Sequence, residues 1–239
     1  MNTFDVKVHY YQLELVKRLS LNHAMRFNDL LIEGLESEHM NYHLKRLIDV
    51  NYVVKEGSLY KLTDIGKDYS NLLDEKTDLV ERQPKTSVVL HIKRKNKNGE
   101  IEHLLLKRLR HPYFGKVGHL TGKVKFGETF LDAAKRELYE ETGLSAKTFI
   151  LEKIYRKMRK RSKEFIQDVV FYQFLITGIN GTLIGKTEFQ ENFWVTKKEA
   201  KTRPDLDFFD DFLIETSLSD SLKPKKLVFV ESLGEAEGY

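Results

Sequence analysis

The amino-acid sequence predicts an α+β protein of two domains joined by a short linker. Residues 1–75 combine apolar stripes at helical spacing with one hairpin, whereas residues 86–218 combine strands with two helices. Between the two, residues 76–85 are polar and include Pro84, a composition typical of a linker. Residues 219–239 follow as a C-terminal tail. A chain of 239 residues is long enough for this organisation.

The first domain is expected to contain its elements in the order helix, helix, helix, hairpin, helix. Apolar residues recur at helical spacing in three segments: Tyr11–Leu19, Phe27–Leu31 and Met40–Ile48. Asn51 follows the third segment as a residue suited to end a helix in the left-handed conformation. Strands at 52–55 and 59–62 flank a Glu-Gly-Ser turn, and Thr63 is a good cap for the last helix.

This order of elements resembles the winged helix-turn-helix domain of bacterial transcriptional regulators. The run Met40–Leu47 is similar to the recognition-helix sequence of those regulators, and the run Leu62–Gly66 is similar to the sequence that follows their wing. One departure is Asn51, where these regulators usually carry glycine. The resemblance implies that the third helix lies in the major groove of double-stranded DNA. Its outward face would then present Tyr42, Lys45 and Arg46.

Two roles for the first domain stay open, because its charge does not favour nucleic acid. Residues 1–80 contain 10 Lys and Arg against 13 Asp and Glu, a net charge of −3. A DNA-binding domain usually carries a basic surface, and small winged helices also serve as protein-interaction or dimerisation modules. The alternatives are therefore DNA binding and a structural or protein-binding role. Because winged-helix regulators usually bind paired half-sites, a homodimer is a further hypothesis.

The second domain is expected to open with a hairpin and to continue with strands that flank two helices. Val88–Ile92 and Ile101–Leu106 lie on either side of Asn98-Gly99, a pair typical of a hairpin turn. Further strands are expected where apolar and β-branched residues gather: Phe149–Ile154, Phe165–Ile176 and Phe193–Val195. One helix is expected between Thr129 and Gly143, and a second over Asp210–Leu218.

The most informative stretch of the chain lies around the first of these helices. Residues 122–144 follow the spacing G-x5-E-x7-R-E-L-x-E-E-x-G-L at nine positions. Thr129 is a suitable N-cap, and Gly143 stands where a helix end requires a left-handed residue. The apolar stripe that should face a core consists of Leu131, Ala134 and Leu138. The carboxylates of one sector beside that stripe are Glu137, Glu140 and Glu141.

Carboxylates gathered on one sector of a helix favour the binding of a cation. At this spacing like charges repel by roughly 0.2–0.5 kcal/mol per pair, and a cation would remove that penalty. Oxygen donors without cysteine suit a hard ion such as Mg²⁺. Metal ions bound to carboxylates can neutralise a diphosphate, orient a water and lower its pKa. The alternative is a solvated amphipathic helix rich in glutamate, which the complete spaced set disfavours.

At every defining position this stretch matches the Nudix box, so residues 86–218 resemble a Nudix hydrolase. The resemblance implies an α/β/α sandwich with a mixed sheet, and hydrolysis of a nucleoside diphosphate linked to another group, X, with Mg²⁺ or Mn²⁺ as cofactor. The metal ligands that it implies are all oxygen donors: Glu128, Glu137, Glu140, Glu141 and the carbonyl of Thr121. Glu128 could instead orient another ligand, and Arg136 would hold the carboxylates by ion pairing. One departure is Leu120-Thr121-Gly122, where many members carry Pro-Gly-Gly.

Residues outside the box complete the expected site. Arg108 is the proposed contact for the substrate phosphates, because the strand before the catalytic loop often supplies such a residue in this family. Glu191, or Glu188, is the proposed base or extra ligand on a later loop. Seven of the eleven residues 153–163 are basic, a density that would attract polyphosphate or nucleic acid but is also typical of a solvated hairpin tip. The proline that tends to mark the ADP-ribose group is absent there, which favours a triphosphate or another nucleotide sugar.

Composition excludes several classes of protein. The chain has no cysteine, and so no disulfide, thiolate metal site or cysteine nucleophile. It has no apolar run near 18 residues and no secretion signal, so we expect a cytoplasmic protein without a membrane span. The leading hypothesis is a Mg²⁺-dependent hydrolase with an accessory winged helix. The alternative is a transcriptional regulator that senses a nucleotide through the Nudix-like domain and binds DNA through the winged helix.

Overall fold

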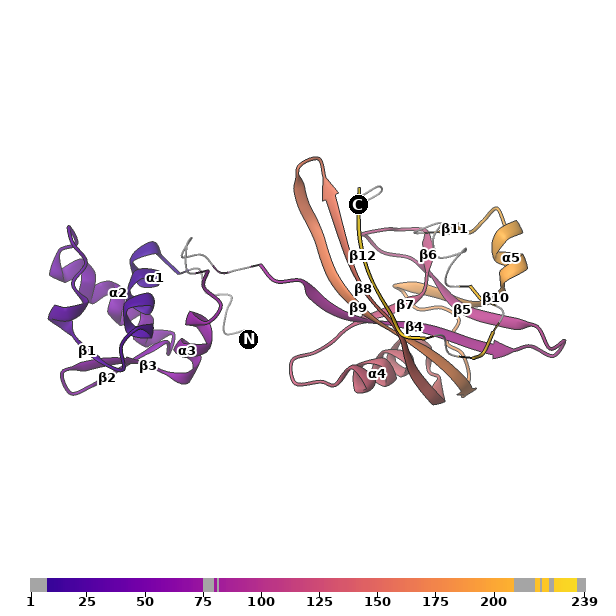
Figure 1. Cartoon of the computed structure of the whole chain (residues 1–239), viewed down its shortest axis with the longest axis horizontal. Coiled ribbons are helices and arrows are strands. Elements are labelled where there is room, and N and C mark those ends of the chain that lie inside the picture. Colours follow the sequence, from indigo (N-terminus) through magenta and orange to yellow (C-terminus); the bar gives the residue numbers. More distant parts are fainter. Residues whose placement is uncertain are drawn as a thin grey trace. The chain divides into compact units, whose positions relative to one another are not determined.

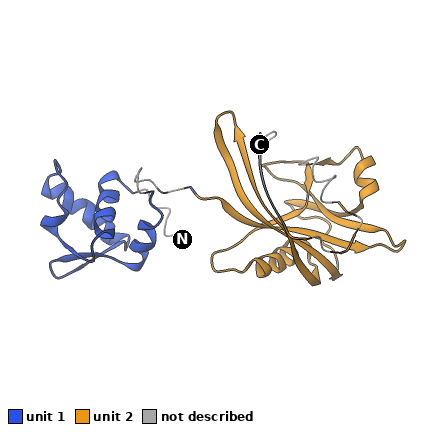
Figure 2. Cartoon of the chain, in the orientation of Figure 1, with its two compact units in different colours: residues 1–82 blue, residues 83–239 orange. Residues whose placement is uncertain are grey.

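A computed structural model describes residues 8–74, 80, 82–208, 218–219, 221–223 and 226–235, the last eight of these through their backbone. The chain divides into two compact units, residues 1–82 (unit 1) and residues 83–239 (unit 2) (Figure 2). The division falls within the expected linker. No helix of the described residues is long and apolar enough to cross a membrane.

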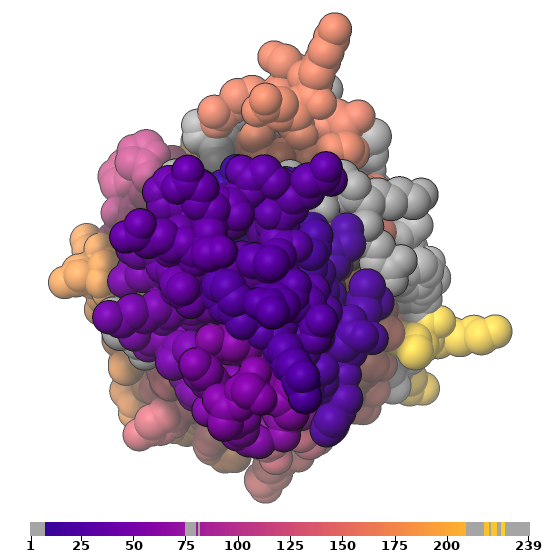
Figure 3. Space-filling view, turned by 90° about the vertical axis from the view of Figure 1, so that its left-hand side faces the viewer, coloured from indigo at the N-terminus to yellow at the C-terminus, as the bar shows by residue number. Residues whose placement is uncertain are grey.

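Unit 1 packs three helices and a small sheet around one core. Its elements are α1 (Tyr10–Ser20), β1 (Met25–Arg26), the 3-10 turn η1 (Phe27–Leu30), α2 (Ser37–Asp49), β2 (Val53–Glu56), β3 (Leu59–Leu62) and α3 (Asp64–Ser70) (Figure 1). The three strands form an antiparallel sheet in the order β1-β3-β2. Figure 3 shows one face of unit 1, coloured indigo to purple, as a continuous surface. The expected second helix is only this 3-10 turn.

Local signals of the sequence account for the ends of these elements. Asn51 has φ 59° and ends α2 in the left-handed conformation, as expected. The Thr63 hydroxyl accepts a hydrogen bond from the amide of Gly66 at 3.0 Å and so caps α3. Gly66 lies against the hairpin, since a Cβ at this residue would be 1.9 Å from the backbone oxygen of Tyr52. Helix α3 therefore approaches the β2–β3 hairpin as closely as backbone atoms allow.

Unit 2 is built on a mixed sheet with the order β11-β6-β5-β4-β9-β8-β12, to which β7 adds beside β4 and β10 beside β5. Its strands are β4 (Lys85–Lys95), β5 (Ile101–Arg108), β6 (Lys116–Gly118), β7 (Leu120–Lys123), β8 (Ser145–Arg161), β9 (Glu164–Asn180), β10 (Gln190–Thr196), β11 (Asp207–Phe208) and β12 (Val228–Glu235). Helix α4 (Phe130–Thr142) packs against β4, β7 and β8, and the short α5 (Lys197–Thr202) packs against β5 and β10 (Figure 1).

Unit 2 differs from the sequence prediction in several places, and strands β6, β7 and β11 were not predicted. Strands β8 and β9 are much longer than expected and form a hairpin that turns at Ser162-Lys163. The expected tail contributes β12, which pairs in parallel with β8. Leu131, which we expected in the core, is 40% exposed, and Ala133 is buried instead. Helix α5 was not predicted, whereas most of the predicted helix 210–218 lies outside the described residues.

Candidate active site

Helix α4 and the loop before it carry the acidic cluster, which consists of Glu128, Glu137, Glu140 and Glu141. The ends of the helix are determined by residues that the sequence identifies. The Thr129 hydroxyl accepts a hydrogen bond from the amide of Asp132 at 3.1 Å, and Gly143 adopts φ 70° at the other end. Ala134 and Leu138 are buried and fix the helix on the sheet. The acidic side chains therefore project from the sector beside this buried stripe.

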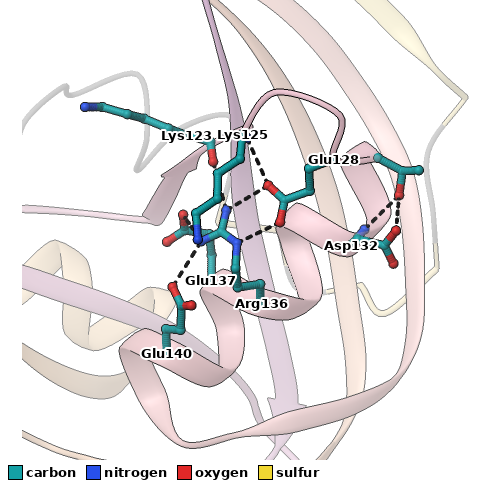
Figure 4. Close-up of polar contacts among 8 residues, drawn as sticks. Lys123, Lys125, Glu128, Asp132, Arg136, Glu137 and Glu140 are labelled. Atoms are coloured by element: carbon teal, nitrogen blue, oxygen red, sulfur yellow. Dashed lines mark hydrogen bonds and ion pairs between the residues drawn. The ribbon is translucent and has the colours of Figure 1, made fainter. Parts of the chain in front are cut away.

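The guanidinium of Arg136 joins three carboxylates of the cluster (Figure 4). Its Nε and Nη2 atoms donate to the two oxygens of Glu128 at 2.7 and 2.9 Å. Its Nη1 donates to Glu137 Oε1 at 2.7 Å and to Glu140 Oε2 at 3.0 Å. The bond from Arg136 and the backbone amide of Lys125 hold the pKa of Glu128 at about 2. Arg136 thus positions the carboxylates by ion pairing, the arrangement that the resemblance implied.

Gly122 leaves the space into which Glu137 fits. A Cβ at Gly122 would lie 2.0 Å from both Cγ and Cδ of Glu137, so even alanine would overlap this side chain. Gly122 lies on β7, which packs against α4. The glycine that opens the box is therefore a steric requirement of the carboxylate that lies opposite.

Glu141 stands apart from the Arg136 network and faces a cavity. Its Oε2 atom is buried without a hydrogen-bond partner. Burial, together with the nearby charge of Glu137, raises the pKa of Glu141 to about 7. Gln190 and Asn192 of β10 donate to the Glu141 backbone carbonyl at 3.4 and 2.9 Å, which ties β10 to the end of α4. A half-buried carboxylate with one buried oxygen is suited to bind a cation or to accept a proton.

The cavity beside Glu141 has a volume of about 310 Å³ and a basic lining. Its cationic residues are Arg108, Arg110, Lys116, Lys153 and Lys157. Its aromatic residues are Tyr113, Tyr155, Phe171 and Phe189. Among the described residues that line it, Glu141 is the single carboxylate. Such a cavity can neutralise a polyanion and offers flat surfaces to a sugar or base.

The structure brings some of the predicted residues into this cavity and leaves others outside. Arg108 and Thr121 line it, and Arg108 also donates to the Pro112 carbonyl at 2.9 Å. Burial and the neighbouring Arg110 lower the pKa of Arg108. Glu188 and Glu191 are exposed and do not line the cavity. Glu191 lies opposite Lys107 on the β10–β5 ladder, so the carboxylate expected from this segment is not brought to the cluster.

Sequence reasoning missed the cavity walls contributed by distant strands. Phe189 and Gln190 line the cavity from the segment in which we expected a carboxylate, and Arg110 lies 4.7 Å from the centroid of the Phe189 ring. Gln173 and His119 line it from β9 and from the residue before β7. The spacing of the box carries no information on these residues, because only the register of the sheet brings them together. Trp194 packs in the core, with Arg94 3.9 Å above its ring.

The expected DNA-contacting residues of unit 1 lie together on one face of α2. Tyr42, Lys45 and Arg46 are all exposed there, beside the buried stripe of the helix. Glu38 and Asp49 are exposed on the same helix, so its surface carries both signs of charge. The geometry is compatible with contact to a groove or to a protein.

The donor chemistry of the acidic cluster fits a hard divalent cation. The candidate ligands are carboxylate oxygens, and the buried Oε2 atom of Glu141 has no other partner. Within the described part of the chain, no three His, Asp or Glu side chains already converge closely enough to hold a metal ion. Arg136 contacts one oxygen of Glu137, one of Glu140 and both of Glu128. Glu128 thus contacts Arg136 through both of its carboxylate oxygens.

Comparisons with known proteins agree on unit 2. A model of the NUDIX domain matches residues 84–215. The chain is 32% identical over 126 residues to an ADP-ribose pyrophosphatase of Methanocaldococcus jannaschii, a match that covers 51% of this chain and 72% of the relative. The mutator MutT protein from Bacillus halodurans superposes with a TM-score of 0.50 at 21% identity, over 62% of this chain and 89% of that chain. A MutT NUDIX hydrolase from Burkholderia pseudomallei gives a TM-score of 0.46 at 22% identity, over 58% and 98%.

Proposed function

Because the chain belongs to the Nudix family of nucleotide pyrophosphohydrolases, we propose that unit 2 hydrolyses a nucleoside diphosphate linked to a group X, with Mg²⁺ or Mn²⁺ as cofactor. The observation that carries this proposal is the position of the acidic cluster. Three carboxylates are held by Arg136, and Glu141 of the same helix lines a cavity whose other charged lining residues are cationic.

Each group of the site has a proposed role. Glu137, Glu140 and Glu141 would hold the cation, which when bound would offset the charge of the diphosphate and lower the pKa of the attacking water. The Thr121 carbonyl is a further proposed ligand. Arg136 and Glu128 would position these carboxylates, while Arg108 would bind a substrate phosphate together with Arg110.

A carboxylate must also accept the proton of the attacking water. Among the described lining residues Glu141 is the candidate for this role, as the alternative to holding the cation, because it faces the cavity and burial raises its pKa to about 7 when no cation is bound. A base with a pKa near the working pH combines availability with driving force. Glu191 stays a second candidate only for a conformation in which its side chain turns toward the cavity.

Hydrolysis assays of the full chain with Mg²⁺ test the proposal. The panel comprises ADP-ribose, suggested by the name of the Methanocaldococcus relative, with canonical and oxidised nucleoside triphosphates, nucleotide sugars, NADH and dinucleoside polyphosphates. We expect release of phosphate or nucleoside monophosphate from at least one compound. Glu140→Gln should reduce turnover at least about 100-fold, since it removes a charge from the cluster. Glu164→Gln is the matched control at an exposed hairpin position. Equal turnover of Glu140→Gln and the unaltered protein would contradict the role of this residue.

Unit 1 supports a second proposal, that of a winged helix-turn-helix domain that binds double-stranded DNA as a homodimer. It rests on the common exposed face of Tyr42, Lys45 and Arg46 on α2 and on the β2–β3 hairpin that follows. The double variant Lys45→Ala/Arg46→Ala should weaken duplex binding, and the salt dependence of binding should become shallower. Fluorescence anisotropy with genomic fragments at low salt measures both, with Lys67→Ala on α3 as control.

The outcomes of these assays separate the two functions. If the chain both hydrolyses a nucleotide and binds DNA, it is an enzyme whose accessory domain binds DNA. If the panel is not hydrolysed but a nucleotide raises the melting temperature, and the chain binds DNA, a nucleotide-sensing regulator becomes the better description. Absence of any duplex binding at low salt would leave unit 1 a protein-interaction module, and a monomeric mass in light scattering would contradict the homodimer.

A further inference from the structure

The cavity carries positive charge at two separate places. Arg108 and Arg110 lie close enough to Glu141 for their charges to influence its pKa, and so mark the end of the cavity near the acidic cluster. Lys153 and Lys157 line the cavity from β8. We call the first pair the near pole and the second pair the far pole. Lys153 and Lys157 are four residues apart on a strand, so their side chains project from the same face.

The register of the sheet gives the separation between the far pole and Thr121, which lies beside the acidic cluster. Thr121 of β7, Val89 of β4, Gln173 of β9 and Lys153 of β8 are successive cross-strand partners, and all four line the cavity. Three interstrand steps of about 4.8 Å place the backbone of Lys153 about 14 Å from that of Thr121. Thr121 adjoins Gly122, against which Glu137 packs. The distance from the acidic cluster to the far pole therefore corresponds to the length of a sugar or a nucleoside.

Aromatic surface lies next to the far pole. Tyr155 follows Lys153 on the same face of β8, and its ring stacks with that of Phe171 at 5.1 Å. The Lys153 ammonium lies 5.0 Å from the centroid of the Tyr155 ring. A ring of the substrate can pack on this surface while a charged substituent lies between the two lysines. In the proposed function the scissile diphosphate lies at the near pole and the acidic cluster, so the far pole would contact another part of the substrate.

We propose that the substrate carries a second phosphate group, separated from the scissile diphosphate by a sugar or nucleoside, and that Lys153 and Lys157 bind this group. The inference rests on the proposed hydrolysis at the acidic cluster and specifies the substrate class of that same site. It predicts that compounds with and without the additional phosphate differ in kcat/KM. Two charge-assisted contacts should give a preference of at least about tenfold.

Matched pairs of diphosphate compounds test this proposal. NADPH and NADH differ only in a 2′-phosphate, coenzyme A and dephospho-coenzyme A only in a 3′-phosphate, and ADP-ribose 2′-phosphate and ADP-ribose form a third pair. The full chain with Mg²⁺ should prefer the phosphorylated member of at least one pair. Lys153→Gln/Lys157→Gln should reduce this ratio to about one, whereas Lys153→Arg/Lys157→Arg should retain it because the charge is kept. Lys160→Gln, on the same strand outside the described cavity lining, is the matched control.

Two outcomes would overturn the second phosphate site while leaving hydrolysis intact. One is a kcat/KM ratio near one for every pair that is cleaved, and the other is a preference that persists in the double glutamine variant. If no member of any pair is cleaved, and no other compound of the panel is cleaved either, the proposed function itself fails, and this inference with it. Thermal unfolding of each variant, followed by the fluorescence of Trp194, shows whether a changed ratio reflects a folded protein.

Discussion

At the scale of single residues, the contact between Gly122 and Glu137 decides where one carboxylate of the acidic cluster lies. Gly122 has no positive φ, so alanine would be tolerated by the backbone alone. The three atoms nearest to a Cβ at this residue all belong to the Glu137 side chain. Because Glu137 is a flexible side chain, it would move aside rather than unfold the domain.

Gly122→Ala is therefore expected to lower kcat at least about tenfold while leaving the melting temperature of unit 2 within a few degrees. The matched control is Gly185→Ala, where a Cβ would meet only the Asn192 backbone oxygen at 3.9 Å. Steady-state kinetics and Trp194 fluorescence during heating measure the two quantities. A large loss of stability in Gly122→Ala would show that the glycine serves the fold instead.

The sequence predicts residues whose relation is local and misses those that only the sheet brings together. Arg136 and the glutamates share one helix or the loop before it, so their spacing alone predicts the cluster. Tyr113, Phe171 and Gln173 come from a loop and a distant strand, and their meeting depends on cross-strand register. The position of Glu191 outside the cavity also depends on the sheet. Successive residues of a strand point to opposite faces, so a difference of one residue decides whether a side chain faces the cavity.

At the scale of elements, the close approach of α3 to the β2–β3 hairpin makes Gly66 necessary. A Cβ 1.9 Å from the Tyr52 backbone oxygen leaves no flexible atom to move, so α3 itself would have to shift. We expect Gly66→Ala to destabilise unit 1 by about 3 kcal/mol, in the upper range of overpacking. Lys67→Ala, an exposed change on the same helix, should cost less than about 0.5 kcal/mol. Urea unfolding followed by far-ultraviolet circular dichroism would detect the difference, and equal midpoints would contradict the steric argument.

Element lengths were predictable where caps and periodicity agree, and not along β8. Helices α1 and α4 begin and end within two residues of their expected limits, because apolar stripes and caps coincide there, whereas α2 begins three residues before its expected apolar segment. Strand β8 carries basic residues on both faces toward its tip, so the alternation that identifies a strand disappears. Strand β12 pairs with β8 across more than seventy residues of sequence, a contact that no local pattern encodes.

At the scale of the whole molecule, buried histidines make the stability of unit 2 dependent on acidity. Burial lowers the pKa of His103 to about 3 and that of His119 well below its usual value. Neither ring has a hydrogen-bond partner within the described structure. Between pH 6.5 and the folded pKa, the unfolded state binds more protons, so the free energy of unfolding falls as the pH falls.

Each such histidine should lower the free energy of unfolding by about 1.4 kcal/mol for each pH unit below 6.5. Between pH 7 and pH 5 the decrease amounts to about 2 kcal/mol per histidine. Urea unfolding followed by Trp194 fluorescence measures this dependence. His103→Leu replaces one titrating group with an apolar side chain of similar volume. The free energy of unfolding of this variant should therefore depend less steeply on pH below about 6.5. A slope that is identical in His103→Leu and the unaltered protein would contradict the assignment.

The two units have separate hydrophobic cores: that of unit 1 is formed by α1, α2 and the small sheet, and unit 2 has one core between the large sheet and α4 and a second that includes Ala200 of α5. A ligand that binds only to folded unit 2 raises the free energy of unfolding of that unit alone. The increase grows with the logarithm of the ligand concentration. The single tryptophan of the chain lies in unit 2, so its emission follows this half of the molecule. In a calorimeter, a nucleotide should then displace one heat-absorption peak along the temperature axis and leave the other where it was. The molecule thus carries an internal reference against which ligand binding at its cavity is measured.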